Sequence, residues 1–227
     1  YLKTAGRFYE LTEIVEQENR SMIVNMLYLR KSLERARERC RKLEEDAVEL
    51  TEKSERDPLT GLEIRDRLTK YSEKIVEQCF AEHKPLSFEI LDIDYFKQYN
   101  DRYGHQAGDD CVRAIAALIR QMESDQIFCA RYGGDEFVII YSGMSAEEVC
   151  ERAEKLRQDV MALQIEQRYT EGAFGVTISQ GICHDIPSNG NKNWDFLHVA
   201  DQALYRVKRR GRNRLCMTDI HGREIEV

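Results

Sequence analysis

The chain has 227 residues, 42% of them hydrophobic, which is enough for one domain of ordinary size plus an extension. Its formal net charge of −7 argues against a nucleic-acid binder, because neutralising phosphates requires a basic face. The seven cysteines show neither CxxC spacing nor paired histidines, which indicates reduced thiols in a cytoplasmic protein. No apolar run approaches the roughly 20 residues of a membrane helix. The chain opens at Tyr1 without a methionine or a signal peptide, so we expect a fragment whose upstream sensor domain is missing.

Residues 1–56 are predicted to form a long signalling helix that pairs as a parallel coiled coil. Asn19 would lie at an inner position of the apolar seam between the two paired helices, where a buried amide can fix the register. The alternative is a single amphipathic helix packed on its own domain, but the stripe is narrow and its flanks are charged, which favours a homodimer. Apolar or small residues recur with an unbroken four-three spacing at Met22, Met26, Leu29, Leu33, Ala36, Cys40, Leu43, Ala47 and Leu50.

Pro58 ends this helix, because proline cannot continue it, and residues 57–227 are predicted to form the globular domain. The hydrophobic pattern predicts helices over 65–82, 107–122, 146–163 and 194–209. Strands are expected over 86–93, 126–130, 137–141, 174–183 and 214–218. Ser145 and Glu148 form a capping box at the start of the third helix. The order β-α-β-β-α-β, with extra helices, predicts an α+β fold with an antiparallel sheet covered by helices.

The pair Gly133-Gly134 lies between two predicted strands and indicates a tight hairpin, in which a type I′ turn needs positive φ at both central residues. Asp135 and Glu136 follow directly, and Asp92 ends the first predicted strand. If the strands are neighbours, the three acids converge, and their repulsion requires a cation such as Mg²⁺ or a raised pKa. The alternative is that each acid is solvated. Strict strand alternation would point Asp135 and Glu136 to opposite faces, so we expect irregular pleating near the two glycines.

Polar and basic residues elsewhere suit a nucleotide. Asn100 can donate and accept hydrogen bonds, and Asp109 can accept from the N1–H and exocyclic amine of guanine. Lys208 and Arg212 belong to a basic segment, residues 208–214, that fits phosphate capture. The alternatives are ordinary helix caps around residue 109 and favourable charge at a helix C-terminus around residue 208.

Together these residues resemble the GGDEF family of diguanylate cyclases, named after the pentapeptide at positions 133–137. The resemblance covers about residues 57–217, and many motifs standing in order are far more specific than the pentapeptide alone. The further motifs are Asp57-Pro58-Leu59-Thr60-Gly61-Leu62, Asp92-Ile93-Asp94-Tyr95-Phe96-Lys97 with Asn100-Asp101, Gly104-His105 with Gly108-Asp109, Ala200-Asp201-Gln202-Ala203-Leu204-Tyr205, and Lys208 with Gly211-Arg212-Asn213.

The resemblance implies a ferredoxin-like, palm-like nucleotidyl-cyclase fold and the condensation of two GTP into cyclic di-GMP with release of two pyrophosphates. It implies that two Mg²⁺ ions, or Mn²⁺, bind Asp92, the carbonyl of Ile93, Asp135 and Glu136. The substrate would be held by Asn100 and Asp109 at the guanine and by Lys208, Arg212, Lys97 and the backbone near Phe96, Gly133 and Gly134 at the phosphates. Each domain would hold one GTP, so a coiled-coil dimer would raise the effective concentration of one half-site near the other.

Two positions depart from the family pattern. The family's inhibitory Arg-x-x-Asp site is replaced by residues 124–127, Ser-Asp-Gln-Ile, so we expect no product inhibition through it. Ile64 stands where the family usually has asparagine, which changes how the next helix begins. Three other functions remain open: a GGDEF domain without turnover that serves as a nucleotide receptor, a related palm-type cyclase or polymerase, and a coiled-coil scaffold.

Overall fold

The computed structural model describes residues 55–166 and 175–226, together with helical residues scattered between positions 20 and 42. The chain divides into two units, Tyr1–Ser54 and Glu55–Val227. In the first unit Met22, Met26 and Leu33 are helical and more than half exposed. Asn19 and several inner positions of the predicted seam lie outside the described residues, so the coiled-coil dimer stays a prediction.

The second unit is built on a five-stranded sheet with the order β2-β3-β1-β4-β5. The central strand β1 pairs antiparallel with β3 and β4, and β3 pairs antiparallel with β2. The fifth strand runs parallel to β4, because helix α6 carries the chain back across the sheet between them. The predicted α+β fold with an antiparallel core is therefore confirmed. The strands are β1 (Leu86–Ile93), β2 (Ile127–Gly133), β3 (Glu136–Ser142), β4 (Ile178–Asp185) and β5 (Leu215–Thr218).

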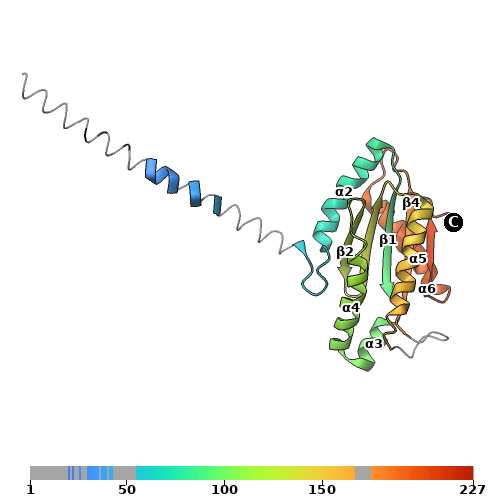
Figure 1. Cartoon of the computed structure of the whole chain (residues 1–227). Helices are drawn as coiled ribbons and strands as arrows, with labels where there is room; N and C mark the ends of the chain where they lie inside the picture. The colour runs from blue at the N-terminus through green and yellow to red at the C-terminus, as the bar shows by residue number, and fades with distance from the viewer. Residues whose placement is uncertain are drawn as a thin grey trace, which may run out of the picture. The chain divides into compact units, whose positions relative to one another are not determined.

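Helices cover both faces of the sheet (Figure 1). Helices α4 (His105–Arg120) and α5 (Ala146–Ala162) pack on one face, and α2 (Arg65–Glu82) and α6 (Asn193–Arg209) pack on the other. Strand alternation explains the division: Phe137 and Ile139 of β3 join the α4–α5 core, whereas Val138 joins the α2–α6 core. Because both faces are buried, β3 is apolar at nearly every position.

The sequence prediction missed one element. Helix α3 (Phe96–Tyr103) follows β1 directly and begins after Tyr95, whose φ of 57° is left-handed. Helices α2 and α5 and strand β1 lie where the pattern placed them, and the capping box of Ser145 and Glu148 is present. Strand β4 begins at Ile178 rather than at residue 174, and residues 167–174 lie outside the described part of the chain.

A buried carboxyl group ties the central strands together. Glu89 lies in the middle of β1 with 0% of its surface exposed, and accepts hydrogen bonds from Tyr141 Oη at 2.6 Å and Gln180 Nε2 at 2.7 Å. Burial raises the pKa of Glu89, and the two hydrogen bonds oppose that shift. Since the partners belong to β3 and β4, this network fixes the register of the three strands that carry the candidate site.

Helix α6 approaches the sheet unusually closely at Gly181 of β4. A Cβ atom at this position would lie 2.2 Å from Leu204 N and 2.3 Å from Ala200 O, so only glycine fits. The close contact seats α6 over β4 and β1 and brings its last turn to the end of β1. Among the described residues, no helix has both the length and the hydropathy that a membrane crossing requires.

Candidate functional site

The β2–β3 hairpin turns at Gly134 and Asp135, while Gly133 is still paired with Glu136. Gly134 has a φ of 52°, and Gly133 is not among the residues with positive φ. The predicted turn with both glycines at its centre is therefore wrong by one residue, because Gly133 remains in the ladder. The pairing shifts between Arg131 and Gly133, so the expected departure from regular pleating is confirmed. Asp135 consequently lies in the turn, where strand alternation does not fix its direction.

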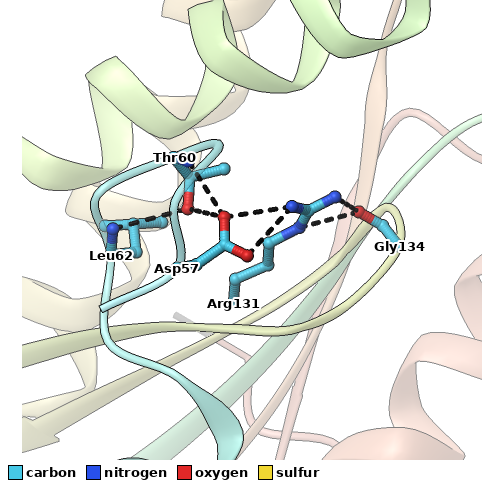
Figure 2. A network of polar contacts seen from close by, with 5 residues as sticks. All are labelled: Asp57, Thr60, Leu62, Arg131 and Gly134. Atoms are coloured by element: carbon cyan, nitrogen blue, oxygen red, sulfur yellow. Dashed lines mark hydrogen bonds and ion pairs between the residues drawn. The ribbon is translucent and has the colours of Figure 1, made fainter. Parts of the chain in front are cut away.

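An arginine holds the turn to the start of the domain, as Figure 2 shows. The guanidinium of Arg131 donates to the carbonyl oxygen of Gly134 from Nε at 3.0 Å and Nη2 at 2.7 Å. Its Nη1 donates to Asp57 Oδ1 at 3.0 Å, and the same carboxylate oxygen accepts from the backbone and hydroxyl of Thr60. Burial raises the pKa of Asp57, but the bonds from Thr60 and Arg131 outweigh it, so the pKa lies below its usual value.

The segment preceding α2 also pairs with β2. Glu63 forms a parallel bridge with Ala130, and Arg131 N donates to Glu63 O at 2.8 Å. Ile64 caps α2 without a side-chain hydrogen bond, as expected where the family's asparagine is absent. Arg65 instead stacks over the ring of Tyr132, at 4.6 Å from the ring centroid. Residues 57–65 thus pack along β2, the strand that leads into the turn, and hold it in place.

Two of the three predicted carboxylates share one face of the sheet. Asp92 of β1 is the register partner of Glu136 of β3, and both alternate onto the α6 face with Val138. Burial raises the pKa of Asp92 to about 6, Lys208 opposes this shift, and the charges of Asp135 and Glu136 reinforce it. All three acids therefore lie within electrostatic reach of one another, as the sequence pattern predicted for neighbouring strands.

Lys208, in the last turn of α6, forms an ion pair with Asp92, with 2.8 Å between Nζ and Oδ2. The side chain of Asp92 is 13% exposed and that of Lys208 is 31% exposed. A hollow of about 410 Å³ adjoins the pair, and Lys208 and Glu136 line it together with Asp201 and Tyr205. The basic segment and the acidic turn thus meet at one end of the sheet.

The donor chemistry fits a hard divalent cation. The half-buried acids Asp92, Asp135 and Glu136 lie close together, and burial and the two neighbouring acids raise the pKa of Asp92. Mg²⁺ is typically bound by one or two carboxylates plus substrate phosphates. Within the described ranges no three metal-ligating side chains form a ready-made cluster. Asp92 is paired with Lys208. Ile93 ends β1 and is 1% exposed, and its apolar side chain has no ligand atom, so only its backbone carbonyl can serve as a metal ligand.

A second polar site lies between α3 and α4. Gly108 packs so closely on Asn100 that a Cβ atom would lie 1.8 Å from Asn100 Oδ1. This oxygen is buried and has no hydrogen-bond partner, which is costly unless a ligand supplies a donor. Asp109 follows Gly108 and is half-buried. The structure therefore brings the two residues predicted to read guanine onto adjoining helices.

The other predicted phosphate ligands flank the end of β1. Phe96 and Lys97 open α3, whose N-terminus has no side-chain cap, and helix N-termini favour anions. Arg212 has a φ of 60°, donates from Nη1 to Tyr95 Oη at 3.1 Å, and stacks over the Tyr95 ring at 4.3 Å from its centroid. Neither this stacking nor the roles of Arg131 and Gly108 were predicted from the sequence pattern. The one available signal was the spacing of Asp57 and Thr60, which is typical of a side-chain-stabilised turn.

This arrangement, an antiparallel core with an acidic hairpin turn beside a central strand that ends in aspartate, has the palm-like architecture that the sequence resemblance implied. Residues 54–214 match the family model described as "GGDEF: Diguanylate cyclase, GGDEF domain". The chain belongs to the GGDEF domain family.

Similar proteins agree with this membership. Diguanylate cyclase DgcP of Pseudomonas aeruginosa is 36% identical over 186 residues, which are 78% of this chain and 27% of that protein. A diguanylate cyclase of Vibrio cholerae is 34% identical over 182 residues, which are 76% of this chain and 53% of that protein. The crystal structure of the coiled coil and GGDEF domain of DgcB from Caulobacter crescentus, in complex with c-di-GMP, aligns with a TM-score of 0.75 and 29% identity, covering 84% of this chain and 99% of that chain. This chain spans about a quarter and about half of the length of the two relatives.

Proposed function

We propose that the chain is a diguanylate cyclase, which condenses two GTP into cyclic di-GMP and releases two pyrophosphates. The observation that carries the proposal is the meeting of Asp92, Glu136 and Lys208 at one end of the sheet, beside the turn that holds Asp135. Phosphoryl transfer requires carboxylates that bind a divalent cation and, beside them, a positively charged side chain that binds the triphosphate. Each metal ligand of the family pattern and both glycines of the turn are present.

The proposed metal ligands are Asp92, the backbone of Ile93, Asp135 and Glu136, and the proposed ions are Mg²⁺ or Mn²⁺. Such ions, when bound, neutralise charge on the reacting phosphates and lower the pKa of an attacking hydroxyl. The side chains of the protein hold the carboxylates in place at the turn and restrict the triphosphate to one position. Arg131 and Asp57 support this arrangement, because they fix the carbonyl of Gly134.

Guanine is assigned to Asn100 and Asp109. The unpartnered Oδ1 of Asn100 can accept a hydrogen bond from an N–H group. An acid at position 109 can accept hydrogen bonds from the N1–H and the exocyclic amine of guanine, a pair of donors that adenine lacks. Lys208 and Arg212 are assigned to the phosphates, and the amides near Phe96 and Lys97 steady them. This set predicts a preference for GTP over ATP.

We further propose that the protein acts as a homodimer through residues 1–56 and responds to a sensor upstream of them. Two half-sites, each holding one GTP, must face each other for the second bond to form. A parallel coiled coil would raise their effective concentration. The four-three spacing of apolar residues supports this proposal, and so does the likeness to a solved chain that combines a coiled coil with a GGDEF domain.

One assay separates the proposal from its alternatives: the purified protein receives GTP and Mg²⁺, and the products are resolved by chromatography. Cyclic di-GMP as the main product supports the cyclase. GTP binding without turnover would instead indicate a receptor, and no GTP binding at all would indicate a scaffold. Linear or nucleoside diphosphate products would indicate a different palm-type enzyme. ATP in place of GTP is the matched control and should give no cyclic product.

A further inference from the structure

Two residues with separate tasks in the proposed function are bound to each other. Asp92 is the proposed metal ligand on β1, Lys208 is the proposed phosphate ligand on α6, and their ion pair measures 2.8 Å. An ammonium group and a divalent cation within a few ångströms of the same carboxylate repel each other. The two cations therefore compete for Asp92.

The surroundings strengthen this competition. Asp92 is 13% exposed, and the acids Asp135 and Glu136 add negative charge near it, so the carboxylate strongly favours a positive neighbour. Lys208 also lines the 410 Å³ hollow beside Glu136, and its flexible four-carbon stem can carry the ammonium group into that space. Electrostatic attraction therefore favours the ion pair of Lys208 with Asp92, and the adjoining hollow gives the lysine side chain space to move away.

We propose that Lys208 is the internal counterion of Asp92 and releases this carboxylate only when a nucleoside triphosphate recruits the ammonium group. Lys208 then opposes the binding of a divalent cation alone and favours the binding of a cation together with a triphosphate. By linkage, the nucleotide tightens metal binding and the metal tightens nucleotide binding by the same factor. The inference rests on the proposed function for the identity of its two ligands.

The test measures the affinity of the full chain for Mn²⁺ in the absence of nucleotide. The electron paramagnetic resonance signal of the free ion reports how much Mn²⁺ remains unbound. Lys208→Met removes the charge and keeps the length of the side chain. We expect this variant to bind Mn²⁺ about tenfold more tightly than the wild type, because an opposite charge beside a carboxylate changes its affinity for a competing cation by about tenfold or more. The same variant should bind GTP with Mg²⁺ more weakly than the wild type. A gain in affinity for Mn²⁺ together with a loss in affinity for GTP is the result expected if Lys208 exchanges Asp92 for the triphosphate.

Two further variants sharpen the measurement. Lys208→Gln keeps a hydrogen-bond donor for Asp92 without the charge, and should show the same tightening of Mn²⁺ binding. Lys84→Met is the matched control, because Lys84 forms a 2.7 Å ion pair with Glu82 before the opposite end of β1 and should change neither affinity. Equal or weaker Mn²⁺ binding by both Lys208 variants would overturn the proposal. Turnover is not part of the readout, so failure here is distinct from failure to form cyclic di-GMP.

Discussion

Replacing Arg131 by methionine should loosen the acidic turn. The guanidinium makes two hydrogen bonds to Gly134 O and two to the carboxylate of Asp57, and the two side chains of the ion pair are 16% and 19% exposed. A hydrogen bond involving a charged group contributes about 1.5–3 kcal/mol, and breaking a buried pair costs about 3–5 kcal/mol. Because these bonds act as a unit and the pair retains contact with water, we expect a loss of about 2 kcal/mol.

For a unit of this size, a loss of that magnitude lowers the melting temperature by about 4–8 °C. Calorimetry or circular dichroism measures the shift, and Arg223→Met is the matched control. Arg223 forms an ion pair with Asp219 at 2.7 Å, but its side chain is 77% exposed, so its removal should leave the melting temperature unchanged. We also expect turnover to fall by about tenfold to a hundredfold, because small displacements of reacting groups have large effects.

The companion variant Asp57→Asn tests the same network through pH. The pKa of Asp57 in the folded protein lies below the ordinary value of 3.8, so its ionised form stabilises the fold above that value, and the contribution disappears as the pH falls through the lowered pKa. Wild type should exceed Asp57→Asn in stability at pH 7, and the difference should shrink in acid. Strictly additive effects of Arg131→Met and Asp57→Asn, or a stability difference that does not change with pH, would refute the coupling.

Three further predictions concern the site and the dimer. Asp135→Ala or Glu136→Ala should abolish cyclic di-GMP formation while circular dichroism shows a folded protein; undiminished product from both variants would contradict the metal assignment. Gly108→Ala should displace Asn100, because the new Cβ would lie 1.8 Å from Oδ1, and weaken GTP binding at least tenfold by calorimetric titration; unchanged affinity would exclude Asn100 from guanine recognition. Deletion of residues 1–50 should lower specific activity most at low protein concentration, whereas activity independent of concentration with and without that segment would contradict dimer control.

The sequence predicted the fold well where the pattern was periodic. Strand β1 and helix α2 were predicted with their observed bounds, because turn residues bracket both runs. Helix α3 was missed, since it is only eight residues long, is mostly polar and aromatic, and follows a left-handed tyrosine that no propensity predicts.

The candidate site could be predicted only in part. The sequence pattern predicted that Asp92 and Glu136 converge if their strands are neighbours, but the register that makes them direct partners is seen only in the structure. The exact centre of the turn could not be predicted, because Gly133 and Gly134 are equivalent as isolated residues. The structure distinguishes them through Arg131, which holds the carbonyl of Gly134 and is itself held by Asp57, 74 positions earlier in the chain. Contacts of such long range are invisible to local patterns.

The most direct test of the central claim is the stoichiometry of the reaction with GTP and Mg²⁺. Cyclic di-GMP is quantified by chromatography and pyrophosphate by an enzyme-coupled assay in the same sample, with Glu136→Ala alongside. The account predicts two pyrophosphates for each cyclic di-GMP in the wild type, and neither product from the variant. Inorganic phosphate and GDP as the main products, or equal cyclic di-GMP from both proteins, would contradict it.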